Sequence, residues 1–84
     1  MAAIFKTPAE NEFNHELGEF LRHARQTQGI SQQELGRRIG VTFQQIQKYE
    51  AGENRLSVWR LCQIAAVLEI PITYFFDTDR PHSK

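Results

Sequence analysis

The sequence predicts an all-α domain, and three observations predict it. Apolar residues recur at helical spacing, capping residues precede the apolar segments and glycines follow them, and no segment alternates apolar and polar residues as a strand does. The 84 residues suffice for one domain with a single core. We expect five helices, at about 15–28, 32–39, 43–50, 57–68 and 72–77. The domain is predicted to span 14–77, between a partly disordered extension at 1–13 and a disordered tail at 78–84.

The first helix is predicted from its apolar stripe and its ends. Asn14 is a suitable N-cap and Gly29 a suitable stop, and "TPAE" at 7–10 is a capping-box pattern that fits one extra turn before the helix. The stripe has the spacing of one helix face, and it consists of Phe13, Leu17, Phe20, Leu21 and Ala24.

Two short helices joined by a sharp turn follow. Capping boxes begin both of them, "SQQE" at 31–34 and "TFQQ" at 42–45, and the Glu34 side chain is placed to reach back to its cap. Gly40 permits the positive φ of the turn, and the small Gly36 lets the two helices approach closely. The segment is therefore predicted to be a helix–turn–helix.

The last two helices are predicted from a serine and a proline. Ser57 caps the fourth helix, and Pro71 occupies a natural first position for a short fifth helix, "PITYFF". The fourth helix is predicted to turn an apolar stripe inward, which consists of Val58, Leu61, Cys62, Ala65 and Leu68.

Charge is distributed unevenly along the chain. The net charge is zero, but residues 22–60 hold seven basic side chains against three acidic ones, and both flanking segments are acidic. Such a local basic field permits an anionic partner, although many charged faces are only solvated.

Reactive constellations of the kind that enzymes use are not evident in the sequence. The histidines, His15, His23 and His82, have no metal-ligand spacing with one another or with Cys62, which is predicted to be a buried small hydrophobe. No glycine-rich phosphate loop is present. We therefore expect no enzyme, no catalytic residue, no metal and no cofactor, and no site for a small-molecule effector is evident.

The cellular compartment of the protein is predicted from its hydropathy and its cysteine content. No apolar run approaches the roughly 20 residues that a membrane span requires, and the N-terminus has no signal-peptide pattern. A single cysteine fits a reducing compartment. We expect a cytoplasmic protein with no membrane partner.

Positions around the third helix separate into two faces. Ile46 and Tyr49 point to the core. The outward face consists of Gln44 and Lys48, flanked by Gln45 and Gln47. Glutamine and lysine are common on solvated surfaces, and they also pair with base edges in a DNA major groove; the helix–turn–helix pattern favours base contacts. Phe43 has two roles open to it, packing at the edge of the core or touching a thymine methyl group.

One carboxylate is predicted to face the core. Glu50 falls on the inner side of the third helix, and a buried charge is costly unless it is paired. Arg25, on the flank of the first helix's stripe, is the best-placed partner. We expect a structural Arg25–Glu50 ion pair that ties these two helices together.

Three further polar residues are predicted to contact phosphates. Asn54 and Arg55 stand in the loop after the third helix, and Gln32 stands in the first turn of the second helix, beside free N–H groups and a favourable dipole. Such contacts position a protein on DNA without selecting a sequence. For Arg55, a solvated loop charge is the alternative.

The stretch "GISQQELGRRIGVTFQQIQKYEAGENRLS", followed by "VWRLCQIAAVLEIP" and "YFF", resembles the lambda-repressor-like, Cro/C1-type (XRE-type) helix–turn–helix regulators. The resemblance covers about 14–77 and implies five helices, with the third in the major groove. The base-facing residues that it implies are Thr42, Phe43, Gln44, Gln47 and Lys48. It also implies that Gln32 binds phosphate and braces the third helix, and that Arg25 pairs with Glu50. Phe43 and Glu53 depart from the family, in which a polar and a basic residue are common at these positions.

The resemblance implies a sequence-specific regulator of transcription that binds double-stranded DNA. The simplest form is a repressor that acts as a homodimer on a palindromic operator. The alternatives are a restriction–modification controller or an antitoxin of the same fold, and a protein-interaction domain that has lost DNA binding. Several apolar side chains either form the dimer surface or close the monomer's core, and they are Leu56, Trp59, Tyr74, Phe75 and Phe76.

Overall fold

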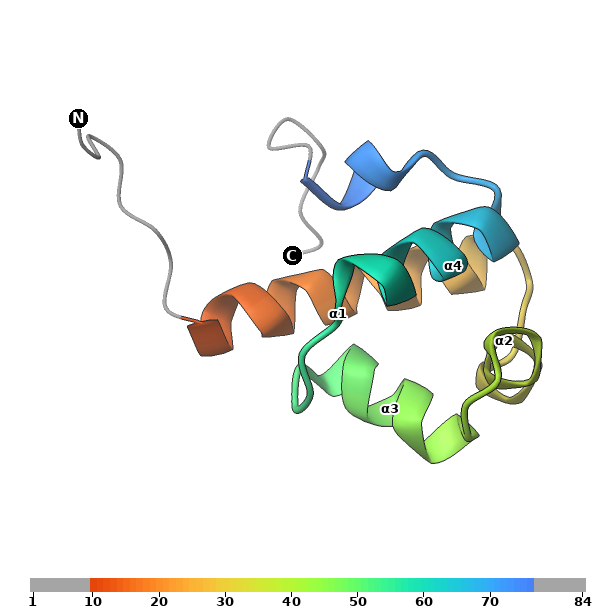
Figure 1. The fold of residues 1–84 in the computed structure, drawn as a ribbon, viewed down its shortest axis with the longest axis horizontal. Coiled ribbons are helices and arrows are strands. Elements are labelled where there is room, and N and C mark those ends of the chain that lie inside the picture. Colours follow the sequence, from red (N-terminus) through yellow and green to blue (C-terminus); the bar gives the residue numbers. More distant parts are fainter. Residues whose placement is uncertain (1–9, 77–84) are drawn as a thin grey trace.

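Four α-helices and one short 3-10 helix make up residues 10–76, the part of the chain that the computed structural model describes (Figure 1). The elements are α1 (Glu10–Thr27), α2 (Gln32–Ile39), α3 (Phe43–Ala51), α4 (Val58–Leu68) and η1 (Ile72–Phe76). No strand occurs among these described residues, so the all-α prediction is confirmed for them. The predicted tail at 78–84, and the predicted extension and extra turn up to residue 9, lie outside the described residues.

Helix α1 packs against α3 and η1. α3 packs against both α1 and α2, α4 packs against α2, and η1 contacts α1 and α4. In Figure 1, α2 and α3 lie together below α1, whereas η1 lies above it. The second and third helices thus form a unit that packs against α1 through α3 and against α4 through α2.

A single apolar core joins these elements. Its largest fully buried side chains come from α1, α2, α3, α4 and η1, and they are Leu21, Leu35, Ile46, Ile64, Leu68 and Phe75. Burying one such side chain contributes roughly 1.5–3 kcal/mol to folding. Through Ile46 and Tyr49, this core helps to hold α3 in place.

Side-chain caps begin three of the helices where the sequence predicts them. Ser31 Oγ, Thr42 Oγ1 and Ser57 Oγ each accept a hydrogen bond from the backbone N–H three residues later, at 3.0, 3.1 and 3.0 Å. Each cap satisfies an N–H group that has no partner within its own helix. The boundaries of α2, α3 and α4 consequently agree with the prediction to within one residue.

The turn between α2 and α3 depends on two glycines. Gly40 has a φ of 80°, in the left-handed region that was predicted for it. A Cβ at Gly36 would lie 2.6 Å from the carbonyl oxygen of Val41. Because no side chain fits at that distance, Gly36 is what allows α2 and the turn to lie so close together.

The start of α1 was predicted incorrectly. The helix begins at Glu10 rather than at 15, so Asn14 lies inside it and is not its N-cap. Glu10 and Glu12 stand in the first turn, where carboxylates interact favourably with the positive end of the helix dipole. The apolar stripe alone gave no sign of these additional residues.

The predicted fifth helix is a 3-10 helix, so the count of five α-helices is not confirmed. The backbone N–H of Tyr74 donates to the carbonyl oxygen of Pro71 at 2.9 Å, which is the i to i+3 bond of this tighter helix. The turn carries Phe75 into the core, where the side chain is 2 % exposed. Five residues, Ile72–Phe76, are enough for this role.

Three side chains predicted to face the core are exposed. Phe13 and Val58 are 40 % and 71 % exposed and lie in the first turns of their helices, and Cys62 is exposed on α4. The inner face of α4 instead consists of Leu61, Ile64, Ala65 and Leu68. Cys62 lies about 100° around the helix from Leu61, which turns it away from this face.

Candidate nucleic-acid interface

Helix α3 presents a polar face to solvent. The exposed side chains at and along it are the N-cap Thr42 and then Gln44, Gln47 and Lys48. Ile46 has no exposed surface and Tyr49 is 9 % exposed, so the other face belongs to the core. Phe43 is partly buried, which is compatible with either role predicted for it. The predicted base-facing residues thus lie on or next to one short helix, and the opposite side of that helix is packed in the core.

Backbone contact holds α3 against α1. A Cβ at Gly18 would lie 2.4 Å from the carbonyl oxygen of Tyr49 and 2.5 Å from that of Glu50. Only glycine permits this approach without moving one of the helices. Sequence reasoning missed Gly18, although a glycine inside an apolar helical stripe is itself a sign of close packing.

A buried polar cluster joins α1, α2 and α3. Arg25 Nε donates to Glu50 Oε2 at 2.6 Å, and Arg25 Nη2 donates to Glu50 Oε1 at 3.1 Å, so the pair anticipated from the helical wheel is present and bidentate. Gln32 Nε2 donates to the same Oε1 at 2.9 Å. Arg25 Nη1 also donates to the carbonyl oxygen of Ile30 at 2.8 Å. Because both charges have several partners, the cost of burying them is offset.

Asn54 and Arg55, the two loop residues predicted to contact phosphates, have different partners within the protein. Asn54 Oδ1 accepts a hydrogen bond from Gln45 Nε2 at 3.2 Å, which ties the loop back to α3. Arg55 is bound by Glu10 of α1: Arg55 Nη2 donates to Glu10 Oε1 at 3.3 Å, and Arg55 Nε contacts the other carboxylate oxygen. Both partners of this ion pair are exposed. The sequence offered no spacing from which the Glu10–Arg55 contact could be predicted.

The carboxylate of Glu34 is engaged by neighbouring arginines rather than by its own cap. It accepts from Arg37 at 2.6 and 3.1 Å and from Arg38 at 2.7 Å. These hydrogen bonds lower the pKa of Glu34 to about 2, with Arg37 the larger cause. The reciprocal half of the predicted capping box is therefore absent, because two cations three and four residues away compete for the carboxylate.

Arg60 is a structural residue that sequence reasoning missed. Its Nη1 donates to the carbonyl oxygen of Ile39 at 3.0 Å and to Gln63 Oε1 at 2.8 Å. The first contact satisfies a carbonyl group at the C-terminal end of α2 and carries a positive charge to the negative end of that helix. Arg60 thereby joins α4 to the helix–turn–helix.

The apolar residues predicted for a dimer surface do not share one environment. Phe75 is 2 % exposed and belongs to the monomer's core, which corrects its assignment to a surface. Tyr74 and Leu56 are partly buried and pack against the same core. Trp59 and Phe76 are 68 % and 50 % exposed. The structure therefore assigns Phe75 to the core, and a dimer surface stays a prediction for the exposed Trp59 and Phe76.

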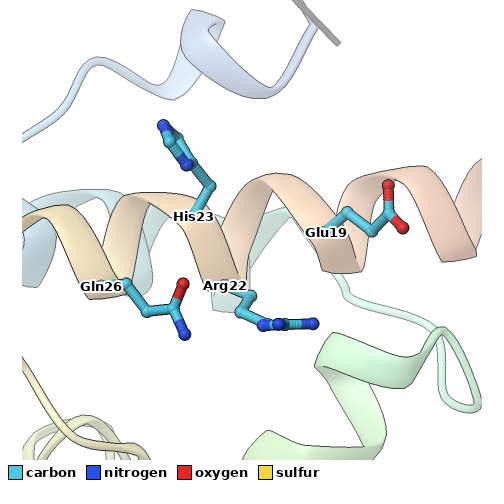
Figure 2. A pocket seen from close by; sticks show the side chains of 4 residues that line it. All are labelled: Glu19, Arg22, His23 and Gln26. Atoms are coloured by element: carbon cyan, nitrogen blue, oxygen red, sulfur yellow. The ribbon is translucent and has the colours of Figure 1, made fainter. Parts of the chain in front are cut away.

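Polar side chains also surround a hollow beside α1. It is lined by Glu19, Arg22, His23 and Gln26, which Figure 2 shows projecting from the helix.

Among residues 10–76, no group of His, Cys, Asp and Glu side chains is placed to hold a metal ion. None of the helices in the same range is long and apolar enough to cross a membrane.

The sequence matches the helix-turn-helix family HTH_3 over residues 21–75. Two curated relatives show the similarity. An uncharacterized transcriptional regulator in the ATPase CF(0) region of Rhodospirillum rubrum is 53 % identical over 60 residues, which are 71 % of this chain and 56 % of the relative. An uncharacterized HTH-type transcriptional regulator of Sinorhizobium medicae is 43 % identical over 67 residues, 80 % of this chain and 48 % of the relative. The chain thus spans about half the length of the curated relatives that it matches.

Solved structures share the fold. The restriction–modification controller protein C.AhdI from Aeromonas hydrophila aligns with a TM-score of 0.70 and 26 % identity over 74 % of this chain and 94 % of its own. The DNA-binding domain of BldD aligns with a TM-score of 0.70 and 25 % identity over 77 % and 94 %. A transcriptional regulator of the same HTH_3 family from Vibrio cholerae has a TM-score of 0.75 and 25 % identity, over 84 % of this chain and 40 % of its own.

Proposed function

The chain belongs to the HTH_3 helix-turn-helix family of transcriptional regulators, and we propose that it recognises a specific DNA sequence by placing α3 in the major groove. For the DNA-binding unit we keep the predicted span 14–77 and extend its start to Glu10, the first residue of α1. A protein with this role acts where the bacterial chromosome lies, in the cytoplasm.

The observation that carries the proposal is the exposed polar face of α3. Gln44, Gln47 and Lys48 are exposed and take no part in the core. A glutamine side chain can pair bidentately with adenine, and a lysine can donate to guanine O6 or N7. Such discrimination requires a fixed helix, and the close contact at Gly18 supplies one. Thr42 and Phe43 complete the base-facing set at the start of the helix.

Phosphate contacts orient the domain on the duplex. Gln32 has one amide proton engaged by Glu50, which leaves the second for a phosphate oxygen. Asn54 retains its amide group, and Arg55 reaches a phosphate when it leaves the Glu10 carboxylate. These three contacts position the protein without selecting a sequence.

A homodimer on a palindromic operator fits the size of the domain. One domain offers few contacts, and two-fold symmetry doubles them at half-sites about 34 Å apart. For the dimer surface we retain Trp59 and Phe76, which are exposed, together with the partly buried Leu56. Repression is the simplest outcome, because a bound dimer occludes a promoter.

Selection of bound duplexes from a random DNA pool tests this function. The full chain is expected to enrich a palindrome with half-sites one helical turn apart. Affinity is expected to fall steeply with salt, since Lys and Arg contacts release counterions. An unenriched pool, together with salt-insensitive binding, would favour a protein-interaction domain and exclude sequence recognition.

A narrower role is favoured by one comparison. The structural similarity to C.AhdI, a restriction–modification controller protein, supports a controller of this type as the second candidate. Genes for a restriction endonuclease and a DNA methyltransferase beside this gene would support it. Their absence would leave the general regulator as the assignment.

A further inference from the structure

A second hollow lies between α1, α2 and α3. It is lined by Arg22, Gln26, Gln32, Gln47 and the Arg25–Glu50 pair. Gln47 connects the hollow directly with the proposed base-facing surface, since it belongs to both. A duplex that meets Gln47 therefore brings part of its backbone to the mouth of the hollow.

Arg22 supplies the uncompensated charge of this hollow. The carboxylate of Glu50 already accepts hydrogen bonds from Arg25 at 2.6 Å and from Gln32 at 2.9 Å. Arg22 is exposed, and among residues 10–76 no hydrogen bond or ion pair engages it. The lining thus carries one excess positive charge, and an anion is the ligand that it favours.

The orientation of two α1 side chains matches that chemistry. Figure 2 shows Arg22 and Gln26 directed from α1 towards the side on which α3 lies, whereas His23 points the other way. Residues four apart on a helix are neighbours on one face. A guanidinium beside an amide NH₂ offers several donors to the oxygens of a single phosphate, and the guanidinium contact is charge-assisted.

We propose that Arg22, assisted by Gln26, binds a phosphate of the DNA backbone and extends the DNA-contacting surface from the helix–turn–helix onto α1. This assignment rests on the proposed function. It differs from the contacts predicted at Gln32, Asn54 and Arg55, because α1 precedes the helix–turn–helix and supplies a contact of its own.

The first test compares two charge-neutralising variants. The full chain, Arg22→Gln and Arg37→Gln are titrated with the duplex that the unchanged protein selects from a random pool, at several salt concentrations. Arg37→Gln removes the same charge from α2, where the side chain is held by Glu34 and does not line the hollow. For Arg22→Gln we expect about tenfold weaker binding to all sequences and a salt slope reduced by about one. For Arg37→Gln we expect an unchanged slope.

The second test locates the phosphate. Single phosphates of the same duplex are replaced by uncharged methylphosphonates. At one position in each half-site, the replacement is expected to weaken binding of the unchanged protein but to have no further effect on Arg22→Gln. Thermal unfolding of Arg22→Gln is expected to match that of the unchanged protein, since this side chain has no partner to lose within the described residues.

The outcomes separate the two proposals. If the unchanged protein selects a sequence while Arg22→Gln and Arg37→Gln have the same salt slope, the assignment of Arg22 is wrong and the proposed function stands. The same conclusion follows if every methylphosphonate weakens Arg22→Gln as much as it weakens the unchanged protein. If the unchanged protein selects no sequence, the proposed function fails and the assignment of Arg22 fails with it.

Discussion

Glu50 is 7 % exposed, and its carboxylate accepts hydrogen bonds from three donor atoms of two other helices. Helical periodicity was sufficient to predict that Glu50 faces inward and that Arg25 is its partner. The part of Gln32 in the cluster could not be predicted from spacing, because it depends on the angle between α2 and α3. The position of a residue around its helix thus identifies a buried charge, but it does not identify all the groups that stabilise that charge.

Removal of this carboxylate is expected to destabilise the fold. Glu50→Gln leaves Arg25 buried without a counter-charge, and the loss of one partner of such a pair costs about 3–5 kcal/mol. Urea denaturation measures the change in the free energy of unfolding. The matched control is the double variant Arg25→Met, Glu50→Leu, which buries no charge and is expected to be more stable than Glu50→Gln. Equal stability of Glu50→Gln and the unchanged protein would contradict a stabilising pair.

Two substitutions at the proposed interface are expected to behave differently. Gln44→Ala removes a proposed base contact and is expected to change which sequence is preferred, at about 1–3 kcal/mol for the affected base pair. Arg55→Ala removes a proposed phosphate contact, so it is expected to weaken binding to all sequences and to reduce the salt slope by about one. Binding assays on the selected duplex and its single-base variants distinguish the two effects. If both variants weaken all sequences equally, Gln44 does not contact bases.

Glu10 is expected to compete with DNA for Arg55. Glu10→Gln releases the guanidinium and removes a negative charge close to it, so DNA binding is expected to strengthen about two- to fivefold, the modest scale of an exposed ion pair. Glu12→Gln is the control, because Glu12 is exposed in the same first turn and its loss changes the net charge equally. An equal gain for both variants in a binding titration would show a general charge effect and no competition.

Helix boundaries were predictable where a local signal specifies them. Ser31, Thr42 and Ser57 cap their helices through bonds that span three residues, so sequence alone contains the necessary information. The start of α1 and the 3-10 geometry of η1 were missed. The former is favoured by a charged first turn outside the apolar stripe, and the latter depends on how Phe75 enters the core. The spacing of apolar residues alone therefore predicts neither the start of α1 nor the geometry of η1.

The contact between α1 and α3 is expected to tolerate no side chain at Gly18. In Gly18→Ala the added Cβ would lie 2.4 Å from a backbone oxygen, so the helices must separate. Such overpacking costs about 1–3 kcal/mol, which exceeds the gain of up to about 1 kcal/mol in helix propensity. Urea denaturation and DNA titration are both expected to show a loss, since α3 moves. Asn11→Ala, at an exposed position of the same helix, serves as the control and is expected to leave both unchanged.

For the molecule as a whole, the net charge of zero gives no sign of an anionic partner, whereas the distribution of charge along the chain permits one. The chain is neutral in total, yet seven of its basic residues fall between 22 and 60, the segment that contains the helix–turn–helix. The surfaces of the domain were less predictable than its core. Phe75 and Trp59 are both large and apolar, but η1 carries Phe75 into the core, whereas Trp59 lies in the first turn of α4 and is not part of that helix's buried face.

Self-association is expected to depend on Trp59. An exposed tryptophan at the centre of an interface contributes about 2 kcal/mol or more, so Trp59→Ala is expected to raise the dimer Kd at least about thirtyfold. Sedimentation equilibrium over a range of concentrations measures this change. Phe13→Ala is the control, because Phe13 is an exposed aromatic residue outside the proposed dimer surface. A monomer at all concentrations for the unchanged protein would exclude the dimer.

The separation of exposed and buried faces on α3 has a consequence for divergence. Ile46, Tyr49 and Glu50 hold the helix in place, while Gln44, Gln47 and Lys48 are not part of the core. Surface substitutions of the latter kind usually change stability by less than about 0.5 kcal/mol. Under the proposed function, a gene duplicate can therefore acquire a new target site by changes at these positions without first acquiring compensating mutations in its core. If these side chains read the bases as proposed, single substitutions can change specificity and leave the fold intact.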